Sequence, residues 1–304
     1  MKQRLSVSII LPNWNGEKLL GENLPKILSA KDNLKNNICE IIVVDDGSTD
    51  SSVVLLEKEY NHQVRLIKHT KNRGFSSAVN MGVRMAKGDL VCLLNTDVIP
   101  SVDFLENVIF DFESNRIAAV GLHERGFGPA VGKFKNGYIS HSGGCEVRKK
   151  MISFWASGGS SVWRRSVWME LKGFDEELFN PFYWEDVDLG YRAWKHGYQI
   201  IWEPSANVIH KHESVINTSN FRKRKLMLIK ERNQLLMTWK NLTSRGLWKK
   251  HLNFLIKRVL REPGYILVVL LAFAKIKMLR KKRNVEIKES TVSDEAIFGF
   301  FEKY

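Results

Sequence analysis

Glu40-Ile-Ile-Val-Val-Asp-Asp-Gly-Ser-Thr-Asp50 joins a run of apolar, β-branched residues to two adjacent carboxylates and a short polar stretch. The apolar run predicts a buried strand over residues 40–44. The hydroxyl and acidic side chains at 48–50 offer oxygens that cap helices, which predicts a helix over 51–60. The stretch therefore indicates a strand, a polar loop and a helix in direct succession.

The same alternation of strand and helix recurs through the first 120 residues. The strand patterns lie at 7–11, 40–44, 64–67, 90–94 and 117–121, and the helix patterns at 20–28, 51–60, 75–86 and 102–112. Such alternation implies right-handed crossovers and an α/β fold with a mainly parallel central sheet. The pattern then weakens. We expect an irregular, glycine-rich excursion over 123–150, helices over 158–168 and 187–197, and a strand over 199–202.

The composition describes a globular body with a basic end. The 304 residues are 44% hydrophobic and 26% charged, which excludes wholesale disorder. The net charge is +14, and residues 217–290 hold 20 Lys and Arg against 4 Asp and Glu, so the rest is nearly neutral. We therefore expect a globular domain at 1–215 and a segment of basic amphipathic helices at 216–304.

Two interpretations of the basic segment stay open. Its helices either cover the body and show their lysines to water, or lie on an anionic membrane surface. Tryptophan and phenylalanine among the basic residues favour the second, and the nearly neutral body argues against nucleic acid as a partner. The longest apolar run, Tyr265–Ala274, is about half of the ~20 residues that a membrane-spanning helix needs.

The expected location is the cytoplasm, peripheral on the inner face of the cell membrane. Three widely spaced cysteines suit a reducing compartment. The apolar run at 5–11 ends in Pro-Asn-Trp-Asn-Gly without a small-residue cleavage site, so it is interpreted as a first strand and not as a signal peptide.

Polar residues follow three of the predicted strands. Ligands of open parallel sheets bind beyond the carboxyl ends of the strands, so these residues are candidates for a binding site. They are Pro12, Asn15, Asp45, Asp46, Asn95 and Asp97. Turns and helix caps also favour Asn and Asp, but they do not explain carboxylates that end all-apolar strands. We favour function for Asp45 and Asp97 and leave both interpretations open for Asp46.

Two glycine-containing loops add candidates. Asn72-Arg73-Gly74 begins a predicted helix, where backbone N–H groups and an arginine suit phosphate. Gly159 lets a ligand approach the backbone closely or belongs to a plain loop.

A second acidic group is Phe182-Tyr-Trp184-Glu185-Asp186-Val-Asp188. Aromatic neighbours reduce the hydration of a carboxylate, which raises its pKa and makes it a better base. The alternative is a helix N-terminus at which acids only favour the dipole. Three acids behind three aromatics favour a catalytic base at Asp186 or Glu185. Further on, His210 and His212 alternate on a predicted strand and so share one face, where they suit a metal or a diphosphate.

Together these motifs resemble those of the family 2 glycosyltransferases, which have the GT-A fold. The resemblance runs from about residue 7 to about residue 214. It rests on SIILPNWNG (8–16), IVVDDGSTD (42–50), NRGFSSAVNMG (72–82), KGDLVCLLNTD (87–97), GFDE (173–176) and EDVDLGYR (185–192). Asn95 departs from the family's Asp-x-Asp motif, and this departure resembles the subgroup of bacterial rhamnosyltransferases.

The resemblance implies inverting transfer of a sugar from a nucleotide-diphospho-sugar to a saccharide or lipid-linked saccharide, in polysaccharide or glycolipid synthesis. Asp186 would be the catalytic base beside Glu185, and Asp97 with His210 would hold Mg²⁺ or Mn²⁺. The residues expected to bind the nucleotide sugar are Pro12, Asn15, Asp45 (at the base), Asp46, Asn72, Arg73, Gly74, Asn95, Gly159 and Trp184. The alternatives are a nucleotidyltransferase of similar fold and a nucleic-acid-binding protein that uses the basic segment.

Overall fold

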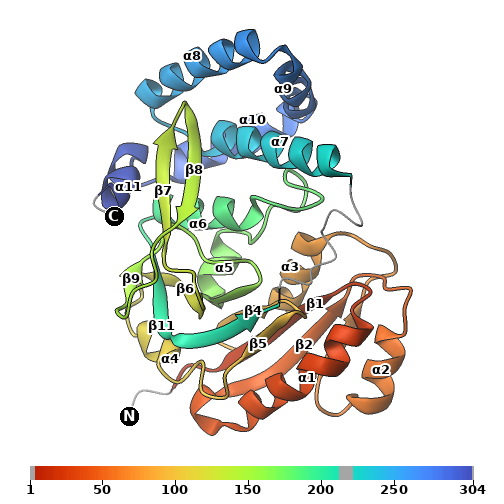
Figure 1. The fold of residues 1–304 in the computed structure, drawn as a ribbon. Helices are drawn as coiled ribbons and strands as arrows, with labels where there is room; N and C mark the ends of the chain where they lie inside the picture. The colour runs from red at the N-terminus through yellow and green to blue at the C-terminus, as the bar shows by residue number, and fades with distance from the viewer. Residues whose placement is uncertain (1–3, 212–221, 303–304) are drawn as a thin grey trace.

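The computed structural model describes residues 4–211 and 222–302. A nine-stranded sheet forms the centre, with helices on both faces and a bundle of C-terminal helices at one end (Figure 1). The strands are β1 (Val7–Asn13), β2 (Ile38–Asp45), β3 (Arg65–Lys68), β4 (Leu90–Leu94), β5 (Val98–Pro100), β6 (Ile117–Glu124), β7 (Ala130–Lys135), β8 (Tyr138–Gly143), β9 (Met151–Ile152), β10 (Ser160–Arg164) and β11 (Gln199–His210). The helices are α1 (Glu17–Asp32), α2 (Ser52–Glu59), α3 (Phe75–Met85), α4 (Val108–Asp111), α5 (Arg165–Glu170), α6 (Glu185–Lys195), α7 (Lys223–Asn241), α8 (Arg245–Arg261), α9 (Ile266–Phe273), α10 (Ile276–Glu289) and α11 (Asp294–Phe301).

The sheet has the order β3-β2-β1-β4-β10-β6-β11-β5, with β9 beside β11. Strands β1 to β4 are parallel, and β6 pairs parallel with β11, whereas β10 runs antiparallel between β4 and β6. The expected α/β fold with a mainly parallel sheet is confirmed. β1, β2 and β4 end at Asn13, Asp45 and Leu94 on one edge, and this edge gathers the polar loops that follow them.

Several expected elements are wrong. The excursion at 123–150 contains the hairpin of β7 and β8, and the helix expected over 158–168 is the strand β10 followed by the short α5. The helix expected over 102–112 shrinks to α4. At the end of β10 the Arg164 guanidinium donates to the carbonyl oxygens of Phe112 and Ile117.

The C-terminal helices pack on the body. α7 contacts α6, β8, α9 and α10, while α11 contacts α6 and β7. Asp294 at the start of α11 is fully buried and pairs with Lys195 of α6 at 2.9 Å. The expected boundary at residue 215 lies outside the described residues. No helix within residues 4–211 and 222–302 combines the length and apolar character needed to cross a membrane.

Candidate active site

A cavity of about 260 Å³ lies where β1, β2 and β4 end, and we call it the strand-end cavity. Six residues that the sequence predicts for a ligand site line it: Pro12, Asp46, Asn72, Gly74, Asn95 and Asp97. Asn13, Thr96 and Phe182, which were not in the predicted set, line it as well. The polar loops after three parallel strands therefore do converge on one cavity.

Asp45 and Asp46 differ in their surroundings. Asp45 does not line the strand-end cavity; it accepts hydrogen bonds from Asn13 Nδ2 at 2.8 Å and from the backbone N–H of Ser48 at 2.9 Å. Asp46 lines the cavity and accepts from the backbone N–H groups of Arg73 and Gly74 at 2.9 and 2.7 Å. Asp45 thus stabilises the loop that follows β2. Asp46 joins that loop to the backbone at Arg73 and Gly74 beside the cavity.

Asn15 and Arg73 lie outside the strand-end cavity. The Asn15 Oδ1 accepts from the backbone N–H of Thr49 at 2.8 Å, so this side chain joins two polar loops. The Arg73 side chain lines a different cavity, together with Asp175 and Glu176. The Asn15 side chain thus holds two loops together, and the Arg73 side chain is exposed.

The loop at Gly158 and Gly159 connects the strand-end cavity to Asp186. The backbone N–H of Asn95 donates to the Gly159 carbonyl at 2.9 Å, and a Cβ on Gly159 would lie 2.3 Å from Asn95 Nδ2. The backbone N–H of the neighbouring Gly158 donates to Asp186 Oδ2 at 3.2 Å, so the same loop contacts both Asn95 and Asp186. Any larger residue at 159 would displace the Asn95 amide, which packs directly against the Gly159 backbone.

Asp97 and His210 meet at the edge of the strand-end cavity. His210 Nε2 lies 3.3 Å from Asp97 Oδ1, and its Nδ1 lies 3.3 Å from Glu124 Oε2. Burial disfavours the charged imidazole, but hydrogen bonds and charge from Asp97 and Glu124 outweigh it and raise the pKa of His210. Glu124, at the end of β6, is a residue that sequence reasoning missed. His212 lies outside the described residues.

The donor set at Asp97 fits a divalent ion in part. Its Oδ2 is buried and has no hydrogen-bond partner among residues 4–211 and 222–302. No group of three or more His, Cys, Asp or Glu side chains arranged to hold a metal occurs in the described ranges. An ion there would take further oxygens from a ligand or from water, as Mg²⁺ commonly does.

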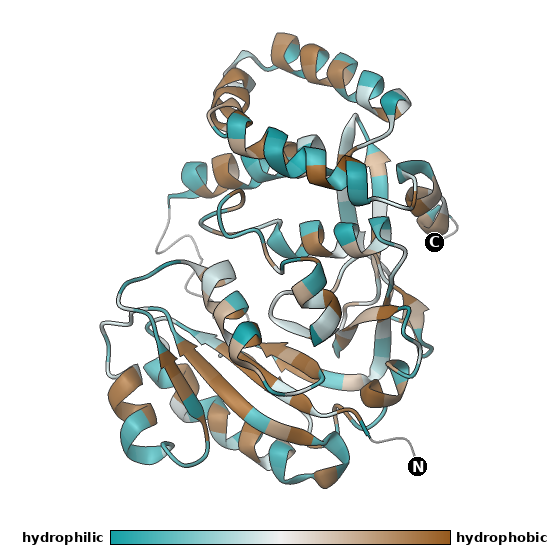
Figure 2. Cartoon of the chain, turned by 180° about the vertical axis from the view of Figure 1, so that it is seen from behind, coloured by the Kyte–Doolittle hydropathy of each residue, from teal (hydrophilic) through white to brown (hydrophobic). Residues whose placement is uncertain are grey.

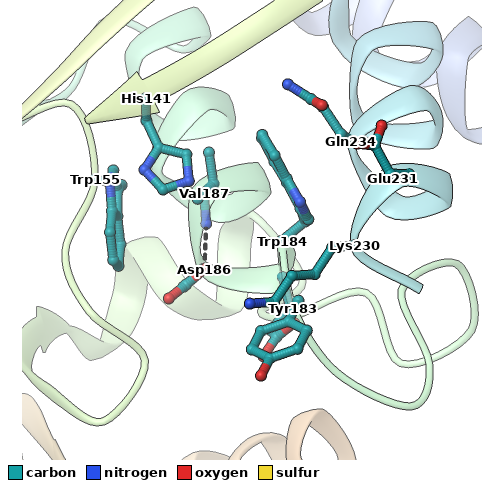
Figure 3. Close-up of a pocket in the computed structure, with 10 residues that line it drawn as sticks. His141, Trp155, Tyr183, Trp184, Asp186, Val187, Lys230, Glu231 and Gln234 are labelled. Atoms are coloured by element: carbon teal, nitrogen blue, oxygen red, sulfur yellow. Dashed lines mark hydrogen bonds between the residues drawn. The ribbon is translucent and has the colours of Figure 1, made fainter. Parts of the chain in front are cut away.

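A second cavity, of about 350 Å³, opens beside Asp186, and we call it the aromatic cavity (Figure 3). The His141 ring lies between Trp155 and Trp184, with ring centroids 5.3 and 5.2 Å away. Glu185 and Asp186 line this cavity from the start of α6. Trp184 therefore belongs to the aromatic cavity and does not line the strand-end cavity.

The carboxyl of Glu185 is buried and that of Asp186 is half-buried at the start of α6. Asp186 accepts from the backbone N–H of Val187 at 2.8 Å, yet its enclosure raises its pKa. Burial and the negative charge of Asp186 raise the pKa of Glu185, whose Oε2 has no hydrogen-bond partner in the described part of the chain. Tyr183 and Trp184 have φ of 74° and 79°, a strained backbone of the kind found at active sites. Asp186 is thus placed and perturbed as a general base would be.

Asp188 has a structural role. It is fully buried and accepts hydrogen bonds from Arg192 Nε and Lys240 Nζ, both at 2.8 Å, and from Asn241 Nδ2 at 2.7 Å. Burial alone would raise its pKa, but the two cations hold the pKa below its usual value. Two of the three acids at 185–188 therefore reach the cavity, and the third anchors α7 to α6.

Sequence reasoning also missed His141, Trp155 and Gln234. His141 lies on the β7–β8 hairpin, and Gln234 lies on α7 within the basic segment. Neither His141 nor Gln234 lies within a sequence motif, and both reach the aromatic cavity only through tertiary packing.

Two family models match the chain: glycosyl transferase family 2 over residues 8–168 and glycosyl transferase family group 2 over residues 90–279. The hyaluronan synthase of Pasteurella multocida is 26% identical over 232 residues, which are 64% of this chain and 23% of that protein. The poly-beta-1,6-N-acetyl-D-glucosamine synthase of Staphylococcus aureus is 25% identical over 207 residues, 66% of this chain and 48% of that protein. The chain thus spans less than half the length of either relative.

Among solved structures, that of GalNAc-T7 with UDP, GalNAc and Mn²⁺ superposes with a TM-score of 0.65 at 15% identity, over 88% of this chain and 58% of that one. This likeness confirms the GT-A fold expected from the motifs. The first family model spans more than half of the chain. The chain belongs to glycosyl transferase family 2.

Proposed function

We propose that this chain is an inverting glycosyltransferase that moves a sugar from a nucleotide-diphospho-sugar to an acceptor hydroxyl, in the synthesis of a cell-surface polysaccharide or glycolipid. The observation that carries the proposal is the pair of adjoining sites. The strand-end cavity contains Asp97, the aromatic cavity contains Asp186, and the Gly158–Gly159 loop bonds to both Asn95 and Asp186. Donor and acceptor would thus meet at one loop.

The reaction follows from this placement. Asp186 takes the proton from the acceptor hydroxyl as that oxygen forms a bond to the anomeric carbon. The bond from that carbon to the diphosphate breaks on the opposite face, and the nucleoside diphosphate leaves with the electron pair. One displacement inverts the anomeric centre and needs no covalent intermediate. A positioned base of this kind contributes roughly 10²–10⁴-fold in rate.

Asp97 and His210 are the residues that would hold Mg²⁺ or Mn²⁺ when the ion is bound. There the ion would supply Lewis-acid stabilisation of the diphosphate charge. The Mn²⁺ and UDP in the GalNAc-T7 structure support this assignment as an analogy. Asn95, in place of a first carboxylate, leaves fewer anionic ligands, and it is the feature that favours the rhamnosyltransferase-like subgroup.

The proposal extends to location. We place the protein in the cytoplasm, peripheral on the inner face of the cell membrane, with residues 1–215 as the catalytic domain and 216–304 as the membrane-associating segment. Helices α8 and α9 with the turn between them (residues 245–273), which we call the α8–α9 elbow, support this location. Their exposed apolar side chains include Leu260, 76% exposed, and Leu270, 58% exposed. Figure 2 shows α9 almost entirely in the hydrophobic colour. Glu231 and Gln234 of α7 also line the aromatic cavity, so the segment contributes to the site.

The test is a panel of UDP-, dTDP- and GDP-sugars, screened by thermal shift with and without Mn²⁺. We expect one donor to raise Tm, to raise it further with Mn²⁺, and to release its nucleotide on incubation. The Asp97→Asn variant should lose the Mn²⁺-dependent part. A flat response to every nucleotide sugar, in a chain that is folded by circular dichroism, would overturn the proposal.

A further inference from the structure

A third cavity, of about 610 Å³, lies between the β7–β8 hairpin and α8, and we call it the basic cavity. Its lining carries four cationic side chains: Lys135, Lys257, Arg258 and Arg261. The hairpin turn packs directly on α8, because a Cβ on Gly137 would lie 2.5 Å from Phe254 Cβ. The two walls of the basic cavity are therefore fixed against each other.

The cations of this cavity are under-neutralised. Arg258 lies 3.0 Å from Glu231 Oε2 and 3.4 Å from Glu262 Oε2. Within residues 4–211 and 222–302, no salt bridge joins Lys135, Lys257 or Arg261 to an acid. The basic cavity therefore keeps a surplus of positive charge, and an anion with several oxygens matches it.

The basic cavity adjoins the aromatic cavity. Gln234 lines both of them and is held by a hydrogen bond from its Nε2 to the carbonyl oxygen of Ile139 at 3.1 Å. Glu231 lines the aromatic cavity and pairs with Arg258 of the basic cavity. A molecule whose sugar lies beside Asp186 would therefore carry its next group into the basic cavity.

One side of α8 faces the basic cavity and another side of the same helix is apolar. Phe254, Lys257, Arg258 and Arg261 line the cavity at the spacing of one helix face. Leu252, Ile256 and Leu260 form a row centred about 150° around the helix from the residues that line the cavity, with Leu260 nearest to Lys257, and they are 42%, 60% and 76% exposed. A hydrocarbon chain joined to an anion in the cavity would reach the apolar row at Leu260, which lies one turn from Lys257.

We propose that the basic cavity binds the diphosphate that links the acceptor sugar to a lipid, with the lipid chain leaving along the apolar row of α8. This inference rests on the proposed function, since it assigns the acceptor of the same site. The diphosphate stays bonded to the acceptor throughout transfer. Lys257 and Arg261 hold it by charge-assisted hydrogen bonds and are positioning residues, not catalytic ones.

The test measures the affinity for farnesyl diphosphate, a sugar-free probe, with excess UDP present to occupy the strand-end cavity. We expect the double variant Lys257→Ala, Arg261→Ala to bind the probe at least tenfold more weakly. The matched control Lys249→Ala, Lys250→Ala removes the same charge from α8 outside the cavity and should stay within twofold. Both pairs are exposed on α8, and circular dichroism verifies that each variant is folded.

A second arm separates a lipid diphosphate from a phospholipid headgroup, using vesicles of phosphatidylglycerol. If the cavity variant loses vesicle binding and keeps the farnesyl diphosphate affinity, the diphosphate assignment is overturned. Equal losses from both pairs, or none, overturn it as well. The donor screen tests the proposed function separately. If the chain binds no nucleotide sugar but the cavity variant still binds the probe tenfold more weakly, the enzyme activity is refuted and the anion site is supported.

Discussion

Asp186 is the residue whose replacement tests the chemistry most directly. Asp186→Asn keeps the shape of the side chain and removes the base, and its single amide oxygen can accept from only one of the two backbone N–H groups, those of Gly158 and Val187, that Asp186 binds. We expect transfer to fall by roughly 10²–10⁴-fold with donor affinity unchanged, since positioned bases contribute about that much. Nucleotide release measures the rate, and titration with the donor measures binding. Near-normal turnover would show that another group takes the proton.

The surroundings of Asp186 also set a pH dependence. Enclosure by protein raises its pKa above the usual value, and the base acts only when deprotonated. The rate should therefore fall as the pH drops through this raised pKa, at a higher pH than an ordinary aspartate, with pKa ~3.9, would give. The measurement is kcat/KM against pH with the donor from the screen. A rate that stays flat down to the ordinary aspartate range would contradict the assignment.

Gly159 tests the contact between the strand-end cavity and the loop that leads to Asp186. In Gly159→Ala the new Cβ would lie 2.3 Å from Asn95 Nδ2, so the Asn95 amide must move. We expect donor affinity to fall about tenfold and the unfolding free energy to fall by about 1–3 kcal/mol, as in other overpacked sites. Gly143→Ala, where a Cβ meets nothing within 4 Å, is the control and should change neither. Unchanged donor titrations of Gly159→Ala would refute the coupling.

At the scale of elements, short buried strands of the parallel half could be predicted and the antiparallel additions could not. Leu90–Leu94 is apolar throughout because it lies in the middle of the sheet, and the prediction and β4 coincide. β10 is flanked by glycines and serines and is followed at once by α5, so its local pattern resembles a helix. Its pairing with β4 and β6, far away in sequence, decides its conformation.

The residues of the candidate site also differ in whether local sequence or tertiary contacts reveal them. Asp97 and Asp186 are recognisable because strand ends and aromatic-acidic runs are local signals. His141 and Gln234 are not, because the β7–β8 hairpin and α7 meet only in the folded chain. Asp45 and Asp46 are adjacent and chemically identical, and only the hydrogen bonds of the folded loops show which one faces the strand-end cavity.

The docking of α11 shows that the C-terminal segment is part of the folded body. Asp294 accepts hydrogen bonds from Lys195 Nζ, the Tyr191 hydroxyl and the backbone N–H of Ser244. Asp294→Ala should destabilise the protein by about 3–5 kcal/mol, because it leaves Lys195 buried without an acid. Urea unfolding measures the change, with the exposed Glu289→Ala as a control expected within about 0.5 kcal/mol.

A similar loss from both variants, or from neither, would mean that α11 does not stabilise the body. If the expected difference is found, a truncation that removes residues 245–304 would change stability and membrane binding together. That truncation would remove Asp294 together with the buried Ile297 and Phe301, and the body would lose stability along with the segment.

For the whole molecule, charge and exposed apolar surface fall at the same end. Residues 217–290 hold 20 Lys and Arg against 4 Asp and Glu, and the α8–α9 elbow lies at the end of the molecule away from the N-terminus (Figure 1). Positive charge draws such a surface to anionic lipid, and apolar side chains hold it there. The protein would then approach the membrane with the basic and aromatic cavities turned toward it.

Point substitutions on the elbow test this orientation without cutting the chain. Ile256→Glu with Leu260→Glu should weaken binding to phosphatidylglycerol vesicles at least about tenfold, because each apolar side chain contributes about 1.5–3 kcal/mol when buried. The control is Leu34→Glu with Val54→Glu, two side chains on the body that are 87% and 48% exposed. Co-sedimentation at several salt concentrations gives the affinities. If both pairs bind as the unmodified protein does, the membrane contacts lie elsewhere; if both lose binding equally, the charge of the added acids and not the elbow is responsible.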